Sequence, residues 1–198
     1  KYMYPLFESI RVEGGRAHLL QYHQNRLNRS YLELFKTACP WALEFILPEL
    51  PAEGLFKLRF KYNKDGFSFE TLQYTPSKIE SLKLIEINSC SYDFKFTDRS
   101  GIDQAFNLRG DCDDVLMTKN GLLTDTSYCN ILLFDGTDWI TPAQPLFKGV
   151  QREYLLDQKM IKVREIHKGD LTLYIGCQLI NALNSFDKNR KFSVDCIK

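Results

Sequence analysis

The chain has 198 residues, of which 44% are hydrophobic and 13% aromatic, and its formal net charge is +1. This length suits one large domain or two small ones, and the apolar content is enough for a sizeable core. A charge near zero gives no case for nucleic acid or an anionic membrane surface, and no apolar run is long enough to span a bilayer. The sequence shows no signal peptide, and strand-like sequence follows Lys1 at once, which leaves open that the natural start is missing.

The first part of the chain predicts two hairpins with a helix between them. Residues 6–20 are typical of a hairpin that turns at Glu13-Gly14-Gly15. Residues 54–74 predict a second hairpin that turns between Asn63 and Gly66, and a linker-like segment follows at 75–82. Helical spacing between the hairpins, over residues 22–35, is shown by Leu27, Tyr31, Leu34 and Phe35.

Beyond residue 82 the pattern alternates short strands and helical segments. The strongest turn signal is Asn120-Gly121, within a hairpin over 113–125, and Asp135-Gly136 marks another hairpin over 130–141. The other predicted elements are strands at 83–89, 162–167 and 177–183 and helical segments at 100–110, 149–160 and 168–174. Strands in hairpins with helices between them predict an α+β fold, with an N-terminal α+β domain at 1–76 and a C-terminal domain at 77–198.

The cysteines and histidines show no metal-binding or catalytic pattern. The six cysteines contain no C-x-x-C pair, and none stands at metal-ligand spacing from a histidine. We therefore expect reduced thiols and a cytoplasmic protein. His18, His23 and His167 are isolated in the sequence, so we expect neither a metal site nor a catalytic triad.

A run of small polar residues between Leu122 and Asn130 precedes an apolar strand, a Pro-containing loop and a helix that starts after Gly149. Taken alone, Asp125 is a turn former and Gly149 a helix entry. However, the first N–H groups of that helix, at Val150 and Gln151, have no partner within it, and the helix dipole favours a phosphate there. The residues alone leave both interpretations open.

The order of these pieces resembles the segment that marks class IV aminotransferases, the fold-type IV pyridoxal-phosphate enzymes. The family pattern is Gly, an acid, a small residue, Asn before an apolar strand, Thr-Pro, then Leu-x-Gly-[Ile/Val/Thr]-x-Arg. The matching residues are Gly121, Asp125, Ser127, Asn130, Thr141-Pro142, Leu146, Gly149, Val150 and Arg152. Residues 6–27 also resemble the family's first hairpin and helix. The resemblance thus covers nearly the whole chain and implies two α/β domains with pyridoxal 5'-phosphate in the cleft between them.

The resemblance also implies a coenzyme site. An acid at the position of Asp125, usually Glu in the family, meets the pyridine nitrogen and keeps it protonated. Arg26 matches the arginine that pairs with the phosphate, although without the resemblance it is better explained as part of a solvated helix face. The other residues implied to contact the coenzyme are Asn130, Gly149, Val150, Gln151, Asn181 and Ala182.

The resemblance places the catalytic lysine at Lys95, between Phe94 and Phe96, where it would form the Schiff base and do the acid–base work. The competing lysine, Lys83, lies on an alternating strand and would face solvent. On the strand-like residues 55–62, Lys57 and Arg59 fall near the family's carboxylate-binding position, and the alternative is an ordinary wet strand face. Arg99 matches no residue with a known role.

The implied function is a pyridoxal-phosphate-dependent 4-amino-4-deoxychorismate lyase that releases pyruvate and p-aminobenzoate for folate biosynthesis. Residues 180–183 (INAL) and the compact chain favour it. An aminotransferase of branched-chain or D-amino acids shares every residue named above, so it stays open. A non-catalytic relative also stays open, because Asp125 is short and the family's opening strand is absent or truncated. Family members form dimers, so we expect a homodimer that binds a small amino substrate with a carboxylate, and neither nucleic acid nor a membrane.

Overall fold

The computed structural model describes residues 5–87 and 92–198, which form two compact units. Of the described residues, the N-terminal unit contains 5–76 and 94–98, and the C-terminal unit contains 77–87, 92–93 and 99–198. The sequence predicted a single crossing between domains after residue 76. Instead the chain returns to the N-terminal unit at 94–98. This segment is too short to show the alternating pattern that would predict a strand.

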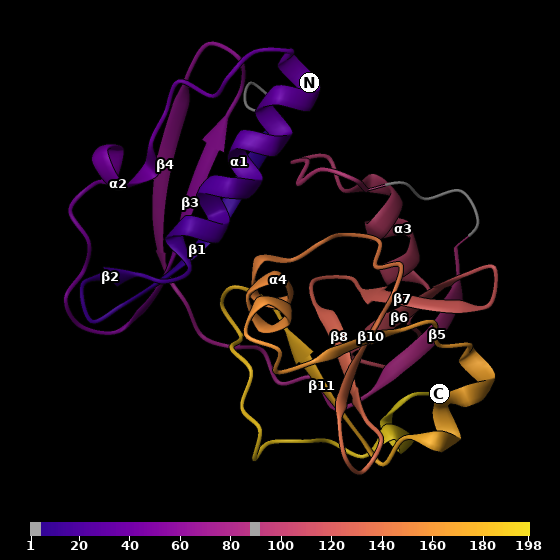
Figure 1. Ribbon diagram of the computed structural model, residues 1–198. Helices are drawn as coiled ribbons and strands as arrows, with labels where there is room; N and C mark the ends of the chain where they lie inside the picture. Colours follow the sequence, from indigo (N-terminus) through magenta and orange to yellow (C-terminus); the bar gives the residue numbers. More distant parts are fainter. Residues whose placement is uncertain (1–4, 88–91) are drawn as a thin grey trace. The chain divides into compact units, whose positions relative to one another are not determined.

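The N-terminal unit is a four-stranded antiparallel sheet in the order β2-β1-β3-β4, with α1 along it (Figure 1). Its elements are β1 (Leu6–Glu13), β2 (Arg16–Ala17), α1 (Leu20–Phe35), α2 (Leu43–Ile46), β3 (Leu55–Tyr62) and β4 (Phe67–Gln73). Both predicted hairpins and the helix between them are therefore confirmed.

Alternation along the strands decides which side chains of this unit face α1. Leu58, Phe60 and Tyr62 of β3 are buried in one cluster with Leu27 and Tyr31 of α1. The cationic side chains between them on β3 point to the other face, as the sequence predicted. Glu8 of β1 has the same phase as its apolar neighbours Leu6 and Ile10 and is completely buried, so a charged group lies on the α1 side of the sheet.

The C-terminal unit contains a sheet in the order β10-β9-β8-β7-β6-β5, and β11 also pairs with β8. The pairs β5–β6 and β9–β10 are parallel and the others antiparallel. The predicted α+β class is confirmed. The elements of this unit are β5 (Leu82–Glu86), α3 (Ser100–Asn107), β6 (Asp114–Lys119), β7 (Leu122–Thr126), β8 (Asn130–Phe134), β9 (Trp139–Pro142), α4 (Val150–Asp157), β10 (Lys162–Arg164), the 3-10 helix η1 (Lys168–Leu173), β11 (Gly176–Ile180) and the 3-10 helix η2 (Val194–Cys196).

Most predicted elements of this unit are found, and several of them end earlier than predicted. The hairpin at Asn120-Gly121 is confirmed, and both residues have positive φ, 52° and 75°, as a tight turn of this kind requires. The predicted strand over 177–183 ends at Ile180, because the Asn181 side chain accepts hydrogen bonds from two following N–H groups and forms a turn. Residues 88–89 of the predicted strand after Lys83, like Cys90, lie outside the described residues.

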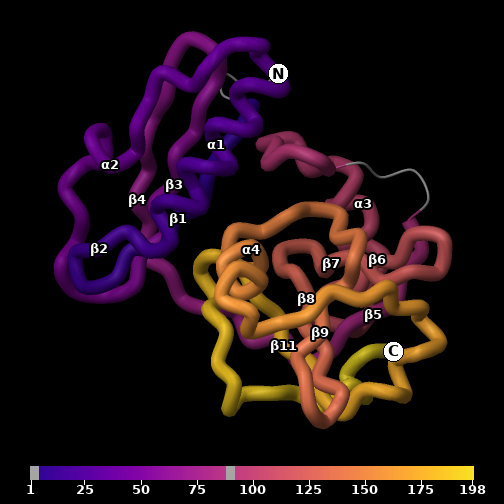
Figure 2. Tube along the Cα trace, viewed as in Figure 1, coloured from indigo at the N-terminus to yellow at the C-terminus, as the bar shows by residue number. Residues whose placement is uncertain are grey.

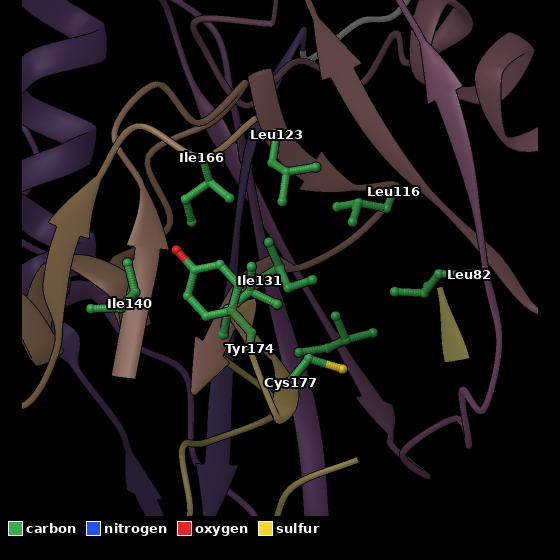
Figure 3. Close-up of a cluster of buried hydrophobic side chains, with 10 residues drawn as sticks. Leu82, Leu116, Leu123, Ile131, Ile140, Ile166, Tyr174 and Cys177 are labelled. Atoms are coloured by element: carbon green, nitrogen blue, oxygen red, sulfur yellow. The ribbon is translucent and has the colours of Figure 1, made fainter. Parts of the chain in front are cut away.

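The central strand β8 is covered on both faces. Its side chains Ile131 and Leu133 belong to a cluster with β7, β9 and β11, part of which is drawn in Figure 3. Leu132 points the other way, into a second cluster with Leu155 of α4. An uninterrupted apolar run suits a strand that is buried on both sides. The packing fixes the place of Asn130, the first residue of β8.

Candidate functional site

Asp125 and Asn130 lie opposite each other where β7 leads into β8. Both side chains are buried. Nδ2 of Asn130 donates to Oδ1 of Asp125 (2.7 Å) and to the carbonyl oxygen of Phe147 (2.8 Å), and the N–H of Phe147 donates to Oδ2 of Asp125 (2.7 Å). The two side chains therefore attach the loop before α4 to the β7–β8 hairpin.

The charge of Asp125 is set mainly by its burial. Burial raises the pKa of this carboxyl to about 7, and the hydrogen bonds from Asn130 and Phe147 and the attraction of Arg152 offset only part of that effect. Arg152 donates its hydrogen bonds to Oγ1 of Thr141 (3.2 Å) and to the carbonyl oxygen of Pro142 (2.9 Å). This explains why Thr-Pro and Arg occur together in the sequence pattern, since the arginine joins α4 to β9.

Gly149 is required by the close approach of Asn130. A Cβ atom built on Gly149 would lie well inside van der Waals contact with Oδ1 of Asn130. Gly149 is also the residue before α4, and no side chain caps this helix start. Val150 and Gln151 follow it, both buried. The first N–H groups of α4 thus stand next to the Asp125–Asn130 pair, at the positive end of the helix dipole.

The turn after β11 is connected to the same hairpin. Oδ1 of Asn181 accepts hydrogen bonds from the N–H groups of Leu183 and Asn184, each at 2.8 Å. Its Nδ2 lies 3.2 Å from Sγ of Cys129, in the β7–β8 connection. Ala182 is part of this turn. Each predicted coenzyme residue of the C-terminal unit therefore either contacts the β7–β8 hairpin or is next in the chain to a residue that does.

Arg26 is part of a buried charged cluster in the N-terminal unit, so the interpretation as a solvated helix face is wrong. Its side chain is only 6% exposed, and its Nε donates to Oε1 of Glu8 (2.9 Å) while Nη2 contacts Oε2. Nδ1 of His23 lies 2.6 Å from the same carboxylate. Burial raises the pKa of Glu8, but Arg26 and His23 outweigh it and hold that pKa at about 2.

His23 is not isolated, contrary to the sequence analysis. Burial lowers its pKa more than Glu8 raises it, so the ring is neutral. Because ionised Glu8 only accepts hydrogen bonds, Nδ1 of His23 is the donor. The signal was present in the sequence: Glu8 interrupts an inward-facing apolar series on its strand, and His23 and Arg26 are three residues apart on one helix face.

Lys95 belongs to the same unit, and its charge acts on the buried His23, whose pKa it helps to lower. The segment 94–98 pairs with the start of β1, where the N–H of Phe7 donates to the Lys95 carbonyl (3.1 Å) and Leu6 bridges Phe96. Paired residues share a face, so Lys95 has the phase of Phe7, and its Nζ lies 4.7 Å from the Phe7 ring centre. The competitor Lys83 is exposed on β5, as its alternating strand indicated.

The candidate carboxylate-binding residues share the face of Lys95. The guanidinium of Arg59 lies 5.1 Å from the ring centre of Phe7, the ring that Lys95 also contacts. Arg59 is also 3.5 Å from Glu70 of β4. Lys57 lies farther along β3, with its Nζ 5.9 Å from the ring centre of Tyr74. The structure therefore brings Arg59 and Lys95 together around Phe7, and Arg26 together with Glu8 and His23 on the α1 side.

Arg99, which matched no family residue with a known role, contacts the β7–β8 connection. Its Nη2 donates to the carbonyl oxygen of Ser127 (2.6 Å), and its guanidinium lies 3.9 Å from the ring centre of Tyr128. A planar guanidinium stacks readily on such a ring. Arg99 thus braces the connection between Asp125 and Asn130.

Within residues 5–87 and 92–198, no group of three or more His, Cys, Asp or Glu side chains could hold a metal ion. Over the same residues, no helix has the length and apolar character needed to cross a membrane.

Similarity to known proteins extends over more than nine tenths of the chain. An uncharacterised protein of Haemophilus influenzae is 34% identical over 186 residues, which is 92% of this chain and 99% of that protein. A solved structure of a candidate 4-amino-4-deoxychorismate lyase from Haemophilus somnus 129pt is 32% identical with a TM-score of 0.87, covering 94% of this chain and 100% of that one.

More distant structures share the fold. A hypothetical aminotransferase of Mycobacterium tuberculosis, solved in its PLP-bound form, is 16% identical with a TM-score of 0.70, covering 98% of this chain and 81% of that one. The family model for class IV aminotransferases matches residues 69–186, which include Lys95, Asp125, Asn130 and the start of α4. The chain therefore belongs to the class IV aminotransferase family, which consists of pyridoxal-phosphate-dependent enzymes of fold type IV.

Proposed function

We propose that the chain is a pyridoxal-phosphate-dependent 4-amino-4-deoxychorismate lyase, which releases pyruvate and p-aminobenzoate for folate biosynthesis. The observation that carries this proposal is the similarity to the H. somnus protein, at 32% identity over 94% of the chain. Residues 180–183, which favoured the lyase over the aminotransferases in the sequence, support the same choice.

The surroundings of Asp125 suit the pyridine nitrogen of the coenzyme. A buried carboxyl whose pKa is about 7 gains from a cation placed beside it, because the cation favours the ionised form. An ionised carboxylate has about four acceptor sites, and the donors Asn130 and Phe147 use one on each oxygen. We assign Asp125 the role of accepting a hydrogen bond from the protonated ring nitrogen.

Three parts of the chain would hold the coenzyme's phosphate. Glu8 fixes the direction of the Arg26 guanidinium, which would supply the positive charge. The N–H groups of Val150 and Gln151 would supply hydrogen bonds at the uncapped start of α4. The turn at Asn181-Ala182, joined to the β7–β8 connection through Cys129, would supply the third contact.

Lys95 would do the acid–base work. When bound, the coenzyme supplies the electron sink that makes the C–H bond beside the substrate's amine acidic. Nζ of Lys95 would take that proton. The bond to the pyruvate fragment on the neighbouring carbon would then break, and the remaining ring would become the aromatic ring of p-aminobenzoate. Arg59 on the same sheet face, with Lys57, would hold a substrate carboxylate near this amine.

The proposal includes a homodimer and a cytoplasmic location, which follow from the family resemblance and the cysteine pattern. The described cysteines Cys39, Cys112, Cys129, Cys177 and Cys196 are free thiols. Free thiols are typical of a reducing compartment, which supports the cytoplasmic part.

A single-turnover assay tests the reaction. We expect the holoprotein to release pyruvate and p-aminobenzoate from 4-amino-4-deoxychorismate and to be inactive on branched-chain and D-amino acids with a keto acid. Amino-group transfer without pyruvate release would replace the lyase by an aminotransferase. A holoprotein that turned over neither set of substrates would favour the non-catalytic relative.

Borohydride reduction of the holoprotein tests the lysine. We expect the coenzyme to be fixed to Lys95, with label retained in Lys83→Ala and lost in Lys95→Ala. Lys83 is the matched control because it is a solvent-exposed lysine on β5. Peptide mapping that placed the label on Lys83, or on any lysine other than Lys95, would overturn the assignment.

A further inference from the structure

Two cysteines far apart in the sequence meet in the C-terminal unit. Cys177 lies on β11 and Cys196 in η2. Their Sγ atoms are 3.6 Å apart, and both are free thiols. A disulfide requires about 2.0 Å between the sulfur atoms, so the two thiols need only a small side-chain movement to bond.

The chain is anchored on both sides of this thiol pair. Before Cys196, Phe192 exchanges two backbone hydrogen bonds with Cys177, at 2.8 and 2.9 Å. After it, the N–H of Lys198 donates to Leu82 and the Lys198 carbonyl accepts from Leu84, both at 2.8 Å. Figure 2 shows this last segment, in yellow, returning to the strand β5. The meeting of the thiols is therefore fixed by the backbone and not by two flexible side chains.

The two thiols have unequal surroundings. Cys177 is buried in the apolar cluster of Figure 3, at 1% exposure, whereas Cys196 is only partly buried. The hydrogen bond between the two thiols lowers the pKa of Cys196 and raises the pKa of Cys177. Because the thiolate is the nucleophile, the more accessible Cys196, with the lower pKa, is the member of the pair that reacts first with an oxidant.

We propose that Cys177 and Cys196 form a redox modification site, in which a peroxide converts the two neighbouring thiols into a disulfide between β11 and the C-terminal segment. The thiolate of Cys196 attacks the peroxide, the O–O bond breaks, and a sulfenic acid forms with release of water or an alcohol. The Cys177 sulfur then attacks the Cys196 sulfur, the S–S bond forms, the S–O bond breaks, and water leaves with the thiol proton. The thiol pair loses two electrons and the peroxide gains them.

The disulfide would tie the C-terminal segment to the sheet covalently. It would close a loop from residue 177 to residue 196 and restrict the unfolded chain, so the oxidised C-terminal unit should melt at a higher temperature. Amide hydrogens of residues 192–198 should exchange more slowly for the same reason. This inference goes beyond the proposed lyase activity and does not depend on it.

The other described cysteines provide the contrast. Burial raises the pKa of Cys129 to about 12, so this thiol is a poor nucleophile. Cys112, which ends the turn before β6, is also buried, and Cys112→Ser serves as the matched control because it removes one thiol away from β11.

The experiment uses the full chain, with and without coenzyme. The protein is treated with hydrogen peroxide, alkylated, digested without reduction and analysed by mass spectrometry. We expect a peptide that links Cys177 with Cys196, loss of two alkylatable thiols, and reversal by dithiothreitol. Cys112→Ser should form the same link, and Cys196→Ser, at a partly exposed position, should not. In the parent, oxidation should raise the melting temperature and slow exchange at 192–198.

Three outcomes would overturn the proposal. One is oxidation of Cys196 to sulfinic acid while Cys177 stays alkylatable, another is a link between other cysteines, and the third is no loss of thiols under peroxide. Because the link is mapped in the unaltered protein, the result does not depend on whether any variant folds.

Discussion

Each unit of the molecule buries one carboxyl group at its candidate site, and the surroundings shift the pKa values of the two groups in opposite directions. In the N-terminal unit the pKa of Glu8 is about 2, although burial alone would raise it, because Arg26 and His23 bond the carboxylate. In the C-terminal unit burial raises the pKa of Asp125 to about 7. Its bonded donors, an amide side chain and a backbone N–H, are both neutral.

The difference shows what decides the charge of a buried acid. Both carboxyls are desolvated, and a hydrogen-bonded guanidinium makes the difference in Glu8. The N-terminal unit carries its own counter-charge, so Arg26 is fixed in place. The ionised form of Asp125 has no such partner, and a cation supplied by a bound ligand, such as a protonated pyridine, would stabilise it. The following predictions test this contrast, from the largest expected effect to the smallest.

Glu8→Gln should be the most destabilising change. It leaves Arg26 buried without its anion, which typically costs about 3–5 kcal/mol of unfolding free energy. Urea unfolding of the N-terminal unit, followed by the fluorescence of Trp41 in a Trp139→Phe background, measures it. Affinity for the coenzyme should also fall, because Arg26 loses its fixed direction.

The matched control is Glu13→Gln on the same strand, where an exposed carboxylate pairs with Arg11. This change should leave the stability almost unaltered, because water screens the pair. Equal losses of stability in the two variants would show that the buried cluster around Glu8 is no stronger than a surface pair, and the contrast with Asp125 would fail.

Asp125 should make the C-terminal unit less stable as the pH rises. The carboxyl has an ordinary pKa of 3.8 when unfolded and about 7 when folded, so between these values only the folded state holds the proton. Stability therefore falls from about pH 4 to pH 7 and then levels off, by on the order of 4 kcal/mol. Asp125→Asn should abolish this slope in the coenzyme-free protein, measured by urea unfolding with Trp139 as the probe in a Trp41→Phe background.

The holoprotein sharpens the same test. If the ring nitrogen meets Asp125, the carboxyl is ionised in the complex and the slope between pH 4 and 7 should shrink in the parent. Asp125→Asn should keep the fold but slow the exchange of the substrate's C–H proton much more than it weakens coenzyme binding. Exchange as fast as in the parent would leave Asp125 with the structural role of bonding Asn130 and Phe147.

Gly149→Ala should cost less than either carboxyl change. The added methyl group would displace Oδ1 of Asn130, and overpacking of this kind typically costs about 1–3 kcal/mol. Because Asn130 bonds Asp125, coenzyme affinity should fall as well. Gly169→Ala is the control, because a Cβ added there would have no atom of the described residues within 4 Å. If both variants bound coenzyme like the parent, the close approach of Gly149 to Asn130 would have no bearing on the site.

Much of the fold followed from local patterns in the sequence. The hairpins at Asn120-Gly121 and Asp135-Gly136 and the helix over 20–35 have short-range signals, a turn dipeptide or a helical spacing, that tertiary contacts do not override. The strand over 177–183 was too long because the Asn181 side chain bonds the following N–H groups and stops it. The Asn181 side chain competes with the neighbouring strand for these N–H groups, and this competition leaves only a weak signal in the sequence although it decides where the strand ends.

Apart from the turn at Asn181, the contacts that the sequence missed join segments that are far apart in the chain. Glu8 and Arg26 meet only because β1 packs on α1, and Cys177 meets Cys196 only because the last residues return to β5. The pairing of 94–98 with β1 likewise joins segments separated by most of the N-terminal unit. Residue types and spacing carry no distance information of this kind. The local signals for the buried cluster were the charged Glu8 in an apolar series and the spacing of His23 and Arg26 on one helix face.

Arg59→Ala should have the smallest effect on stability and separates binding from folding. Arg59 and Lys61 lie on one face of β3, and both reach Glu70, at 3.5 and 2.8 Å. Partly exposed pairs of this kind contribute less than about 1 kcal/mol, so Arg59→Ala and Lys61→Ala should unfold alike. If Arg59 holds a substrate carboxylate beside Lys95, only Arg59→Ala should raise KM for the amino substrate, by about ten- to a hundredfold for a lost charge-assisted bond, with kcat less affected. A rise in KM for Lys61→Ala instead would move the carboxylate site by two residues along the strand.

Unchanged KM in both variants, and in Lys57→Ala, would show that this face of the sheet does not bind substrate and is an ordinary solvated surface. The charged residues with a role at the site in the N-terminal unit would then be the buried ones around Glu8.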